Sequence, residues 1–211
     1  MSGARPANTG PASTVSGSTG STSTELPSTE LPSTELPGAG LPGAGLPGAK
    51  LAVAGLAAQI VGLLMRRRQT VAVAESLTGG LLGAAITTVP GASSVFRGGV
   101  IAYATDVKAA LLGVSAALLA ERGAVDPEVA GAMAAGVRER LGAAIGAATT
   151  GVAGPDAADG KPPGTVHIAV STAGGTVVQT LALSGGRDEI RRDTVERSLR
   201  LMWSVLWEET P

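Results

Sequence analysis

One stretch constrains the fold of this chain more than any other: Val71-Ala-Val-Ala-Glu-Ser-Leu-Thr-Gly-Gly80. Its first four residues are small and apolar, and two of them are β-branched, which predicts a short buried strand. The strand is expected to end at Glu75 and Ser76. An apolar helical run follows from Leu81 to about residue 89, with Thr78 as its expected N-cap.

The turn between this strand and helix allows two interpretations. A serine at a strand-to-helix turn can act as a nucleophile, and the N–H groups of two following glycines can form an oxyanion site. Ser76, Gly79 and Gly80 fit that pattern. Alternatively, a tight turn needs glycine for its backbone alone. The decapeptide does not decide between the two interpretations, so the rest of the chain has to.

Composition excludes several classes of site. The 211 residues include no cysteine and one histidine, which removes thiol nucleophiles, disulfides, thiolate metal sites and multi-histidine metal sites. We therefore expect no metal. A formal net charge of −1 gives no electrostatic support for a nucleic-acid partner. The single histidine, His167, lies mid-strand between Val166 and Ile168, a position that favours a structural role.

The first 49 residues differ in composition from the rest. Ser, Thr, Gly and Pro dominate, and a five-residue repeat places a proline at every fifth position from Pro27 to Pro47. Such prolines block helix and sheet, and one leucine per repeat cannot offset the entropy of ordering. We expect a disordered tail over 1–49 and one domain over 50–211. No secretory signal or membrane span is predicted, which indicates a cytoplasmic protein.

The remaining chain alternates helices and strands and carries a hairpin late in the order, which predicts an α/β layered domain on a mixed sheet. Asp126-Pro127-Glu128 is a strong helix start, combining a cap, an N1 proline and a first-turn acid. Helices are expected over 51–68, from Thr105-Asp106 to Leu112, over 127–141 and from the cap Asp188; strands are expected over 96–104, 144–150, 164–172 and 176–184.

Lysine is the second base to consider beside histidine. The chain has 13 arginines against 3 lysines, and beyond the tail the lysines are Lys108 and Lys161. Arginine cannot lose its proton in a protein, whereas burial can lower the pKa of a lysine toward neutrality. Lys108, just after the strand that contains Tyr103, is therefore a candidate base. A solvated charge on a short helix is the alternative.

Five linked motifs together resemble the CinA C-terminal domain family, although each alone is weak. They cover nearly all of residues 51–208 in order and spacing. The resemblance implies a three-layer α/β/α fold and nicotinamide-nucleotide amidohydrolase activity, without a metal or other cofactor. The motifs are Ala74-Glu-Ser-Leu-Thr-Gly-Gly80, Val89-Pro-Gly-Ala-Ser-Ser-Val-Phe-Arg-Gly-Gly-Val-Ile-Ala-Tyr103, Lys108 to Val114, Gly123-Ala-Val125, and Thr150-Gly-Val-Ala-Gly-Pro-Asp156 to Lys161-Pro-Pro-Gly-Thr-Val166.

The resemblance also implies roles for individual residues. Ser76 matches the family's nucleophile and Lys108 its base, while Tyr103 would hold or relay the proton. Thr150 matches a polar residue of the active site. The loop residues Gly151 and Gly154 would contact the phosphate or ribose of the substrate. An arginine would bind the phosphate; Arg191 is the first match for it and Arg187 the alternative. The expected partner is a small nucleotide, and a homodimer fits the family.

Three positions depart from the family pattern. Leu77 replaces a Cys or Thr, Ala157-Ala158-Asp159 stands where glycines are usual, and His167 replaces an aromatic residue. Two other functions stay open at this point. One is a nucleotide-binding or regulatory module of the same fold without turnover, and the other is a serine amidase that acts on a different amide.

Overall fold

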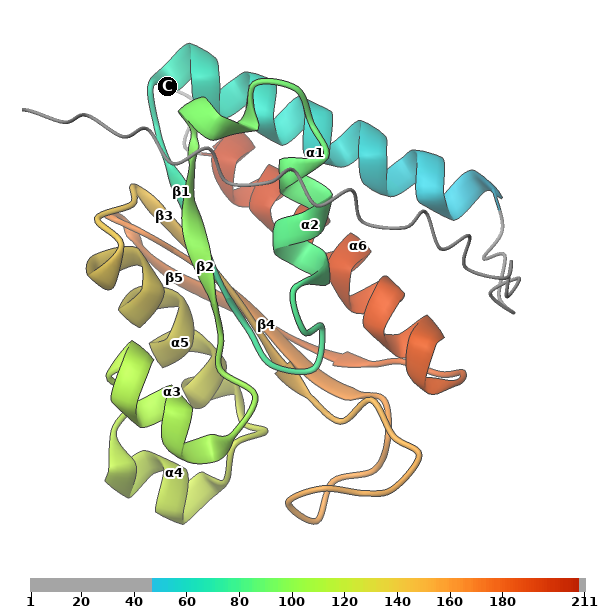
Figure 1. Cartoon of the computed structure of the whole chain (residues 1–211). Helices are drawn as coiled ribbons and strands as arrows, with labels where there is room; N and C mark the ends of the chain where they lie inside the picture. Colours follow the sequence, from blue (N-terminus) through green and yellow to red (C-terminus); the bar gives the residue numbers. More distant parts are fainter. Residues whose placement is uncertain (1–46, 209–211) are drawn as a thin grey trace, which may run out of the picture. The chain divides into compact units, whose positions relative to one another are not determined.

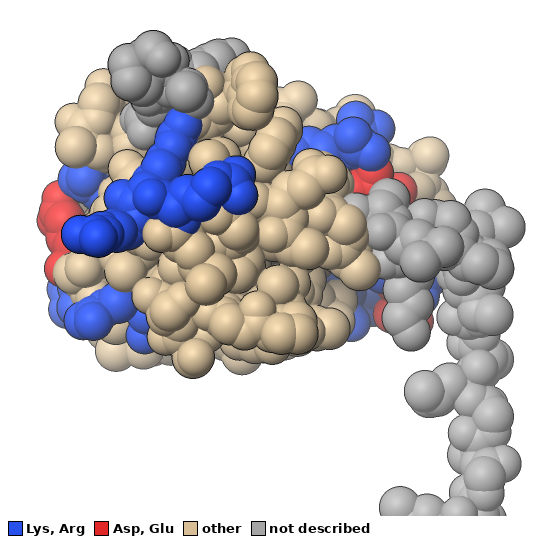
Figure 2. Space-filling view, turned by 90° about the horizontal axis from the view of Figure 1, so that it is seen from above, with Lys and Arg blue, Asp and Glu red and all other residues tan. Residues whose placement is uncertain are grey.

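The computed structural model describes residues 47–208. The tail that we expect to be disordered lies outside the described residues except for residues 47–49, which begin helix α1 (Pro47–Arg67). Arg66 and Arg67 occupy the last turn of α1, as predicted for a basic helix terminus facing the negative end of the helix dipole. Figure 2 shows the molecule from above: the described surface is mostly uncharged, with one group of Lys and Arg side chains at the left and another at the upper right beside acidic side chains.

A mixed five-stranded sheet forms the centre of the domain, as expected for the α/β class. Its strand order is β2-β1-β3-β4-β5. The strand β1 pairs in parallel with both β2 and β3, whereas β3–β4 and β4–β5 are antiparallel. The strands are β1 (Val71–Glu75), β2 (Phe96–Ile101), β3 (Ile145–Gly151), β4 (Thr165–Thr172) and β5 (Gly175–Ala182).

Helices cover both faces of this sheet and complete the three layers implied by the resemblance (Figure 1). One apolar cluster joins α1, α2 and α6 to the sheet, and a second joins α3, α4 and α5 to its other face. The remaining helices are α2 (Leu81–Thr87), α3 (Thr105–Leu112), α4 (Ala116–Arg122), α5 (Pro127–Arg140) and α6 (Arg187–Glu208), with a 3₁₀ turn, η1, at Ala92–Ser94.

The strand β1 is buried on both faces, which explains its uninterrupted apolar sequence. Val71 and Val73 belong to the cluster of α1, α2 and α6, whereas Ala72 and Ala74 belong to the cluster of α3, α4 and α5. Side chains alternate across a strand, so four consecutive apolar residues supply both layers. This places Glu75 on the same side of the sheet as Val73.

Several element boundaries differ from the expectations. The expected strand over 96–104 ends at Ile101, and the helix α4, with Ser115 as its cap, was not predicted. Thr105-Asp106, whose side chains could cap a helix, form the first two residues of α3, and Ala104 holds the N-cap position. Asp188 lies inside the first turn of α6, and Glu189 is the residue that accepts the N–H of Gly186 there. The start of α5 and the late hairpin are confirmed.

The connections from β1 and β2 leave the sheet toward opposite faces. The chain passes from β1 through α2 on one face, and from β2 through α3, α4 and α5 on the other. In open α/β sheets, the crevice at the carboxyl ends of strands whose connections diverge in this way is the usual ligand site. Ser76 follows β1, Tyr103 lies after β2 and Thr150 is the penultimate residue of β3, so the candidate residues meet at this edge.

Candidate active site

Ser76 lies at the first position after β1 and is only 8% exposed. Its N–H donates to the carbonyl of Thr149 at 3.0 Å, which fixes the residue to the end of the neighbouring strand β3. The turn that follows passes through Gly79 (φ 58°) and Gly80 (φ 99°), in the left-handed region that favours glycine. The sharp strand-to-helix turn expected from the sequence is therefore present.

Lys108 reaches Ser76 from the helix α3. Its Nζ lies 3.1 Å from Ser76 Oγ and donates to the carbonyl of Ala102 at 2.7 Å. The side chain is 1% exposed, and no carboxylate within the described residues forms a salt bridge with it. Burial lowers the pKa of Lys108 below its ordinary 10.5, and the charge of Asp159 opposes part of this shift. Such an amine is suited to accept the serine proton.

The N–H groups of both turn glycines already have partners. The N–H of Gly79 donates to the carbonyl of Ser76 at 3.1 Å, and that of Gly80 donates to Glu75 Oε2 at 2.9 Å. The expected oxyanion donors are thus occupied within the turn. Among the described residues, the N–H groups of Leu77 and Thr78 are the ones next to Ser76 that have no protein acceptor. The residue after the nucleophile supplies such a donor in nucleophile elbows.

Thr78 does not cap α2, contrary to expectation. Its hydroxyl is within 2.8 Å of the hydroxyl of Thr149, whereas the N-cap position belongs to Gly80. The carboxylate of Glu75 accepts the orphan N–H groups at the start of the helix instead. Sequence reasoning assigned no role to Glu75. The available signal was an acidic residue shortly before a helix whose first turn contains no acid.

Thr150 is buried, and its hydroxyl donates to the carbonyl of Ala124 at 2.7 Å. It thus connects the end of β3 to the loop between α4 and α5. Gly151 ends β3, and Gly154 lies in the following loop, which extends beyond β3 and β4 (Figure 1). A Cβ on Gly151 would collide with the backbone of Thr165 and Val166, so that glycine is required by the packing of the strands.

The two candidate arginines make different contacts. Arg191 donates from Nε to the carbonyl of Leu77 at 3.0 Å and from Nη2 to the carbonyl of Thr78 at 2.9 Å. Arg187 donates to the carbonyl of Gly154 and to the hydroxyl of Tyr103. Arg191 therefore holds the turn that carries Ser76, whereas the exposed Arg187 joins Tyr103, which follows β2, to the loop that contains Gly154.

Tyr103 lies two residues after the end of β2, with 60% of its surface exposed. Its hydroxyl accepts from Arg187 Nη2 at 2.9 Å. Within the described residues it makes no hydrogen bond to Ser76 or Lys108, so a proton relay through Tyr103 stays a prediction. The contact that is present makes Tyr103 a partner of the rival arginine.

The loop that departs from the family pattern is attached to its neighbours by its own side chains. Asp159 Oδ2 accepts from the N–H of Ala124 at 2.6 Å and from that of Val125 at 3.3 Å. Lys161 Nζ donates to the carbonyl of Arg122 at 3.3 Å. These bonds hold the loop against the segment between α4 and α5. They also place the carboxylate of Asp159 where it acts on Lys108.

His167 is buried in β4 and is not part of the serine–lysine pair. Its Nδ1 is 2.9 Å from Thr180 Oγ1, and its Nε2 has no partner within the described part of the chain. Burial is the main reason that its pKa lies below the ordinary 6.5; the charge of Asp126 raises it and that of Lys161 lowers it. The hydrogen bond across the strands agrees with the structural role expected for this histidine.

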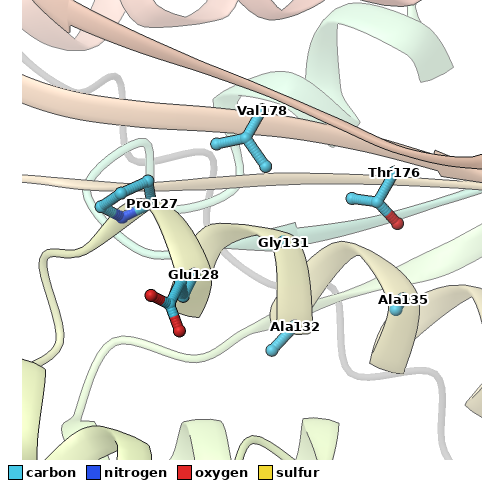
Figure 3. A pocket seen from close by; sticks show the side chains of 7 residues that line it. All are labelled: Pro127, Glu128, Gly131, Ala132, Ala135, Thr176 and Val178. Atoms are coloured by element: carbon cyan, nitrogen blue, oxygen red, sulfur yellow. The ribbon is translucent and has the colours of Figure 1, made fainter.

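Other features of residues 47–208 lie apart from this site. In this range, no three His, Cys, Asp or Glu side chains gather as metal ligands, and no helix is both long and apolar enough to cross a membrane. An open groove of about 470 Å³ lies between α5 and β5. Figure 3 shows Ala132 and Ala135 of α5 beside Thr176 and Val178 of β5; Pro127, Glu128 and Gly131 complete the lining.

Comparison with known proteins shows the family of this chain. Residues 53–206 match the model of the CinA C-terminal domain. The chain belongs to this family. A CinA-like protein of Frankia casuarinae is 53% identical over 151 residues, which are 72% of this chain and 35% of that protein. A putative competence-damage inducible protein of Desulforamulus reducens is 48% identical over 144 residues, 68% and 35% of the two chains. The chain thus spans about a third of the length of these curated relatives.

Solved structures of the CinA superfamily have the same fold. The competence/damage inducible protein CihA from Agrobacterium tumefaciens has a TM-score of 0.71 at 34% identity, covering 73% of this chain and 95% of that one. The competence damage-inducible protein A (ComA) from Klebsiella pneumoniae has a TM-score of 0.73 at 28% identity, covering 75% and 99%. Here the match includes nearly the whole of each solved chain.

Proposed function

We propose that this CinA-family domain hydrolyses the carboxamide of nicotinamide mononucleotide to nicotinic acid mononucleotide and ammonia. The observation that carries the proposal is the 3.1 Å separation of Lys108 Nζ and Ser76 Oγ in a buried setting. A buried lysine without a carboxylate partner is readily neutral, and a neutral amine within hydrogen-bond reach of a serine can activate it. The choice of substrate rests on the family resemblance.

The first half of the reaction transfers the acyl group to the enzyme. Lys108 Nζ takes the hydroxyl proton of Ser76 while Ser76 Oγ bonds to the carboxamide carbon. The bond to Ala102 occupies one N–H of Lys108, which orients the amine toward the serine. We assign the developing oxyanion to the N–H groups of Leu77 and Thr78, because those of Gly79 and Gly80 have other acceptors.

The second half releases both products. The C–N bond breaks, and the leaving amine takes the proton from Lys108 and departs as ammonia. Water then attacks the acyl-serine, losing a proton to Lys108, and the returning proton restores the hydroxyl of Ser76. Lys108 therefore ends each turnover neutral, and no group other than substrate and water is consumed.

The negatively charged phosphate of the substrate needs a fixed cation. Arg187 suits this role better than Arg191, because Nε and Nη2 of Arg191 are bound to backbone carbonyls and its Nη1 lies 3.7 Å from Asp188. The guanidinium of Arg187 is exposed and is oriented by Tyr103 and Gly154. Arginine binds phosphate through paired, charge-assisted hydrogen bonds.

Ammonia release from nicotinamide mononucleotide by the full chain tests the proposal. We expect turnover in the parent protein, its loss in Ser76→Ala and Lys108→Ala, and parent-like turnover in the control Ser94→Ala, an exposed serine bonded to its own turn. Binding of the nucleotide without ammonia release would favour a regulatory module. Turnover of a different amide alone would favour the other serine-amidase function.

A further inference from the structure

Glu75, the residue immediately before Ser76, is a buried carboxylate with an unusual set of partners. It is 2% exposed. Its Oε2 accepts from the N–H groups of Gly80 at 2.9 Å and Leu82 at 3.1 Å, and its Oε1 accepts from that of Gly83 at 2.8 Å. A single side chain therefore binds three backbone donors at the start of α2, where orphan N–H groups and the positive end of the helix dipole favour an anion.

The carboxylate is directed away from the reacting groups. The strand alternation puts Glu75 with Val73 on the face covered by α1, α2 and α6, whereas Lys108 comes from α3 on the opposite face. Hydrogen bonds to α2 engage both carboxylate oxygens. Glu75 is therefore neither a base for Ser76 nor a counter-ion for Lys108, which leaves the lysine free of a carboxylate partner.

These bonds close a small ring around the candidate nucleophile. The ring consists of the backbone from Glu75 to Gly80 and is closed by the hydrogen bond between the Glu75 carboxylate and the N–H of Gly80. Ser76 and the two N–H groups assigned to the oxyanion belong to this stretch of backbone. Gly83 lies directly against the carboxylate, since a Cβ there would make an ordinary van der Waals contact with Glu75 Oε1 at 3.4 Å. The same carboxylate fills the start of α2, so a substrate anion has to bind elsewhere.

We propose that Glu75 is a positioning residue for Ser76: by binding Gly80, Leu82 and Gly83, its carboxylate fixes the turn that presents the serine and the N–H groups of Leu77 and Thr78 to a substrate carbonyl. This inference rests on the proposed function. Glu75 would then affect the rate of the reaction as well as the stability of the fold. Misplacing reacting groups by about 1 Å can cost on the order of 100-fold in rate.

Glu75→Gln in the full chain tests the inference, because glutamine keeps the size of the side chain and one acceptor oxygen but turns an NH₂ group toward a backbone donor. We expect kcat for nicotinamide mononucleotide to fall about 10- to 100-fold with KM nearly unchanged. The rate at which a fluorophosphonate labels Ser76 should fall in parallel. The control Ser115→Ala removes the cap of α4 and should lower the thermal midpoint without changing either rate.

The outcomes separate this inference from the proposed function. If the parent labels at Ser76 but does not turn over the nucleotide, and Glu75→Gln labels more slowly, the positioning role stands and the substrate assignment fails. Parent-like kcat and labelling in Glu75→Gln overturn the positioning role, as does a parent whose Ser76 is never labelled. If the Gln variant does not fold, Glu75→Asp, which keeps the charge but is one methylene shorter, is measured against the same expectations.

Discussion

Arg187 Nη2 donates to the hydroxyl of Tyr103 at 2.9 Å, across 84 positions of sequence. The same guanidinium donates to the carbonyl of Gly154, so one side chain joins α6, the end of β2 and the loop after β3. Arg187 thereby connects three segments that meet at the carboxyl edge of the sheet. Because this contact leaves the guanidinium of Arg187 exposed and without a salt bridge in the described part of the chain, it is the arginine that we propose for a bound anion.

Arg187→Ala should weaken substrate binding more than it slows the chemical step. Loss of a charge-assisted bond to phosphate corresponds to about 1.5–3 kcal/mol, so KM for nicotinamide mononucleotide should rise roughly 10- to 100-fold with little change in kcat. Steady-state kinetics with nicotinamide mononucleotide and with its nucleoside, which lacks phosphate, check this. An equal loss for both substrates would contradict a phosphate contact.

Arg191→Ala should have a different kinetic effect. It removes two hydrogen bonds to the carbonyls of Leu77 and Thr78, so the turn that carries Ser76 loses support from α6. We expect kcat to fall, KM to change little, and the free energy of unfolding to drop by about 1–3 kcal/mol. Denaturant titration and kinetics measure the two effects. A raised KM at parent-like kcat would instead make Arg191 the phosphate ligand.

The pH dependence of kcat/KM should report the protonation of Lys108. Neutral Lys108 is the reactive form, so the rate should rise with pH, with a midpoint below 10.5 because burial lowers this pKa. Asp159→Asn removes the charge that raises the pKa of Lys108, so its midpoint should move to lower pH. A pH–rate profile for each protein gives the comparison. An unchanged midpoint would show that Asp159 does not act on the lysine.

The lowered pKa of Lys108 should also make the free energy of unfolding depend on pH. Below the folded pKa, Lys108 is charged in both the folded and unfolded states, and its buried charge costs the folded state. Between the folded pKa and 10.5, the unfolded chain binds more protons, so stability rises with pH. Lys108→Met should therefore raise the free energy of unfolding at neutral pH. The difference in unfolding free energy between the variant and the parent should become smaller as the pH rises from the folded pKa to 10.5. A constant difference across pH would contradict a depressed pKa.

Much of the fold could be predicted from local sequence signals. The buried strand at Val71 with its glycine turn, the start of α5 at Asp126 and the late hairpin each have a short-range physical cause. The rarity of lysine made Lys108 a candidate base and the family resemblance gave it that role; the structure places Lys108 beside Ser76. The helix α4 was missed, although Ser115 before an apolar run was the signal for its cap.

The details of the site that could not be predicted depend on where side chains and backbone N–H groups point, which residue type alone does not determine. Arg187 and Arg191 lie one helical turn apart, and only the path of the loops decides which one binds the Ser76 turn. Whether an N–H group is free also depends on how the turn folds back onto its own residues. Gly79 and Gly80 looked available as oxyanion donors, but Ser76 and Glu75 accept their N–H groups.

The central claim is that Ser76, activated by Lys108, forms an acyl-enzyme. Rapid acid quenching of a single turnover with nicotinamide mononucleotide, followed by peptide mass spectrometry, tests it most directly. We predict that the Ser76 peptide gains the mass of the nucleotide minus ammonia, and that this adduct is absent in Lys108→Ala. Turnover that proceeds with no adduct on Ser76, and persists in Ser76→Ala, would contradict the account.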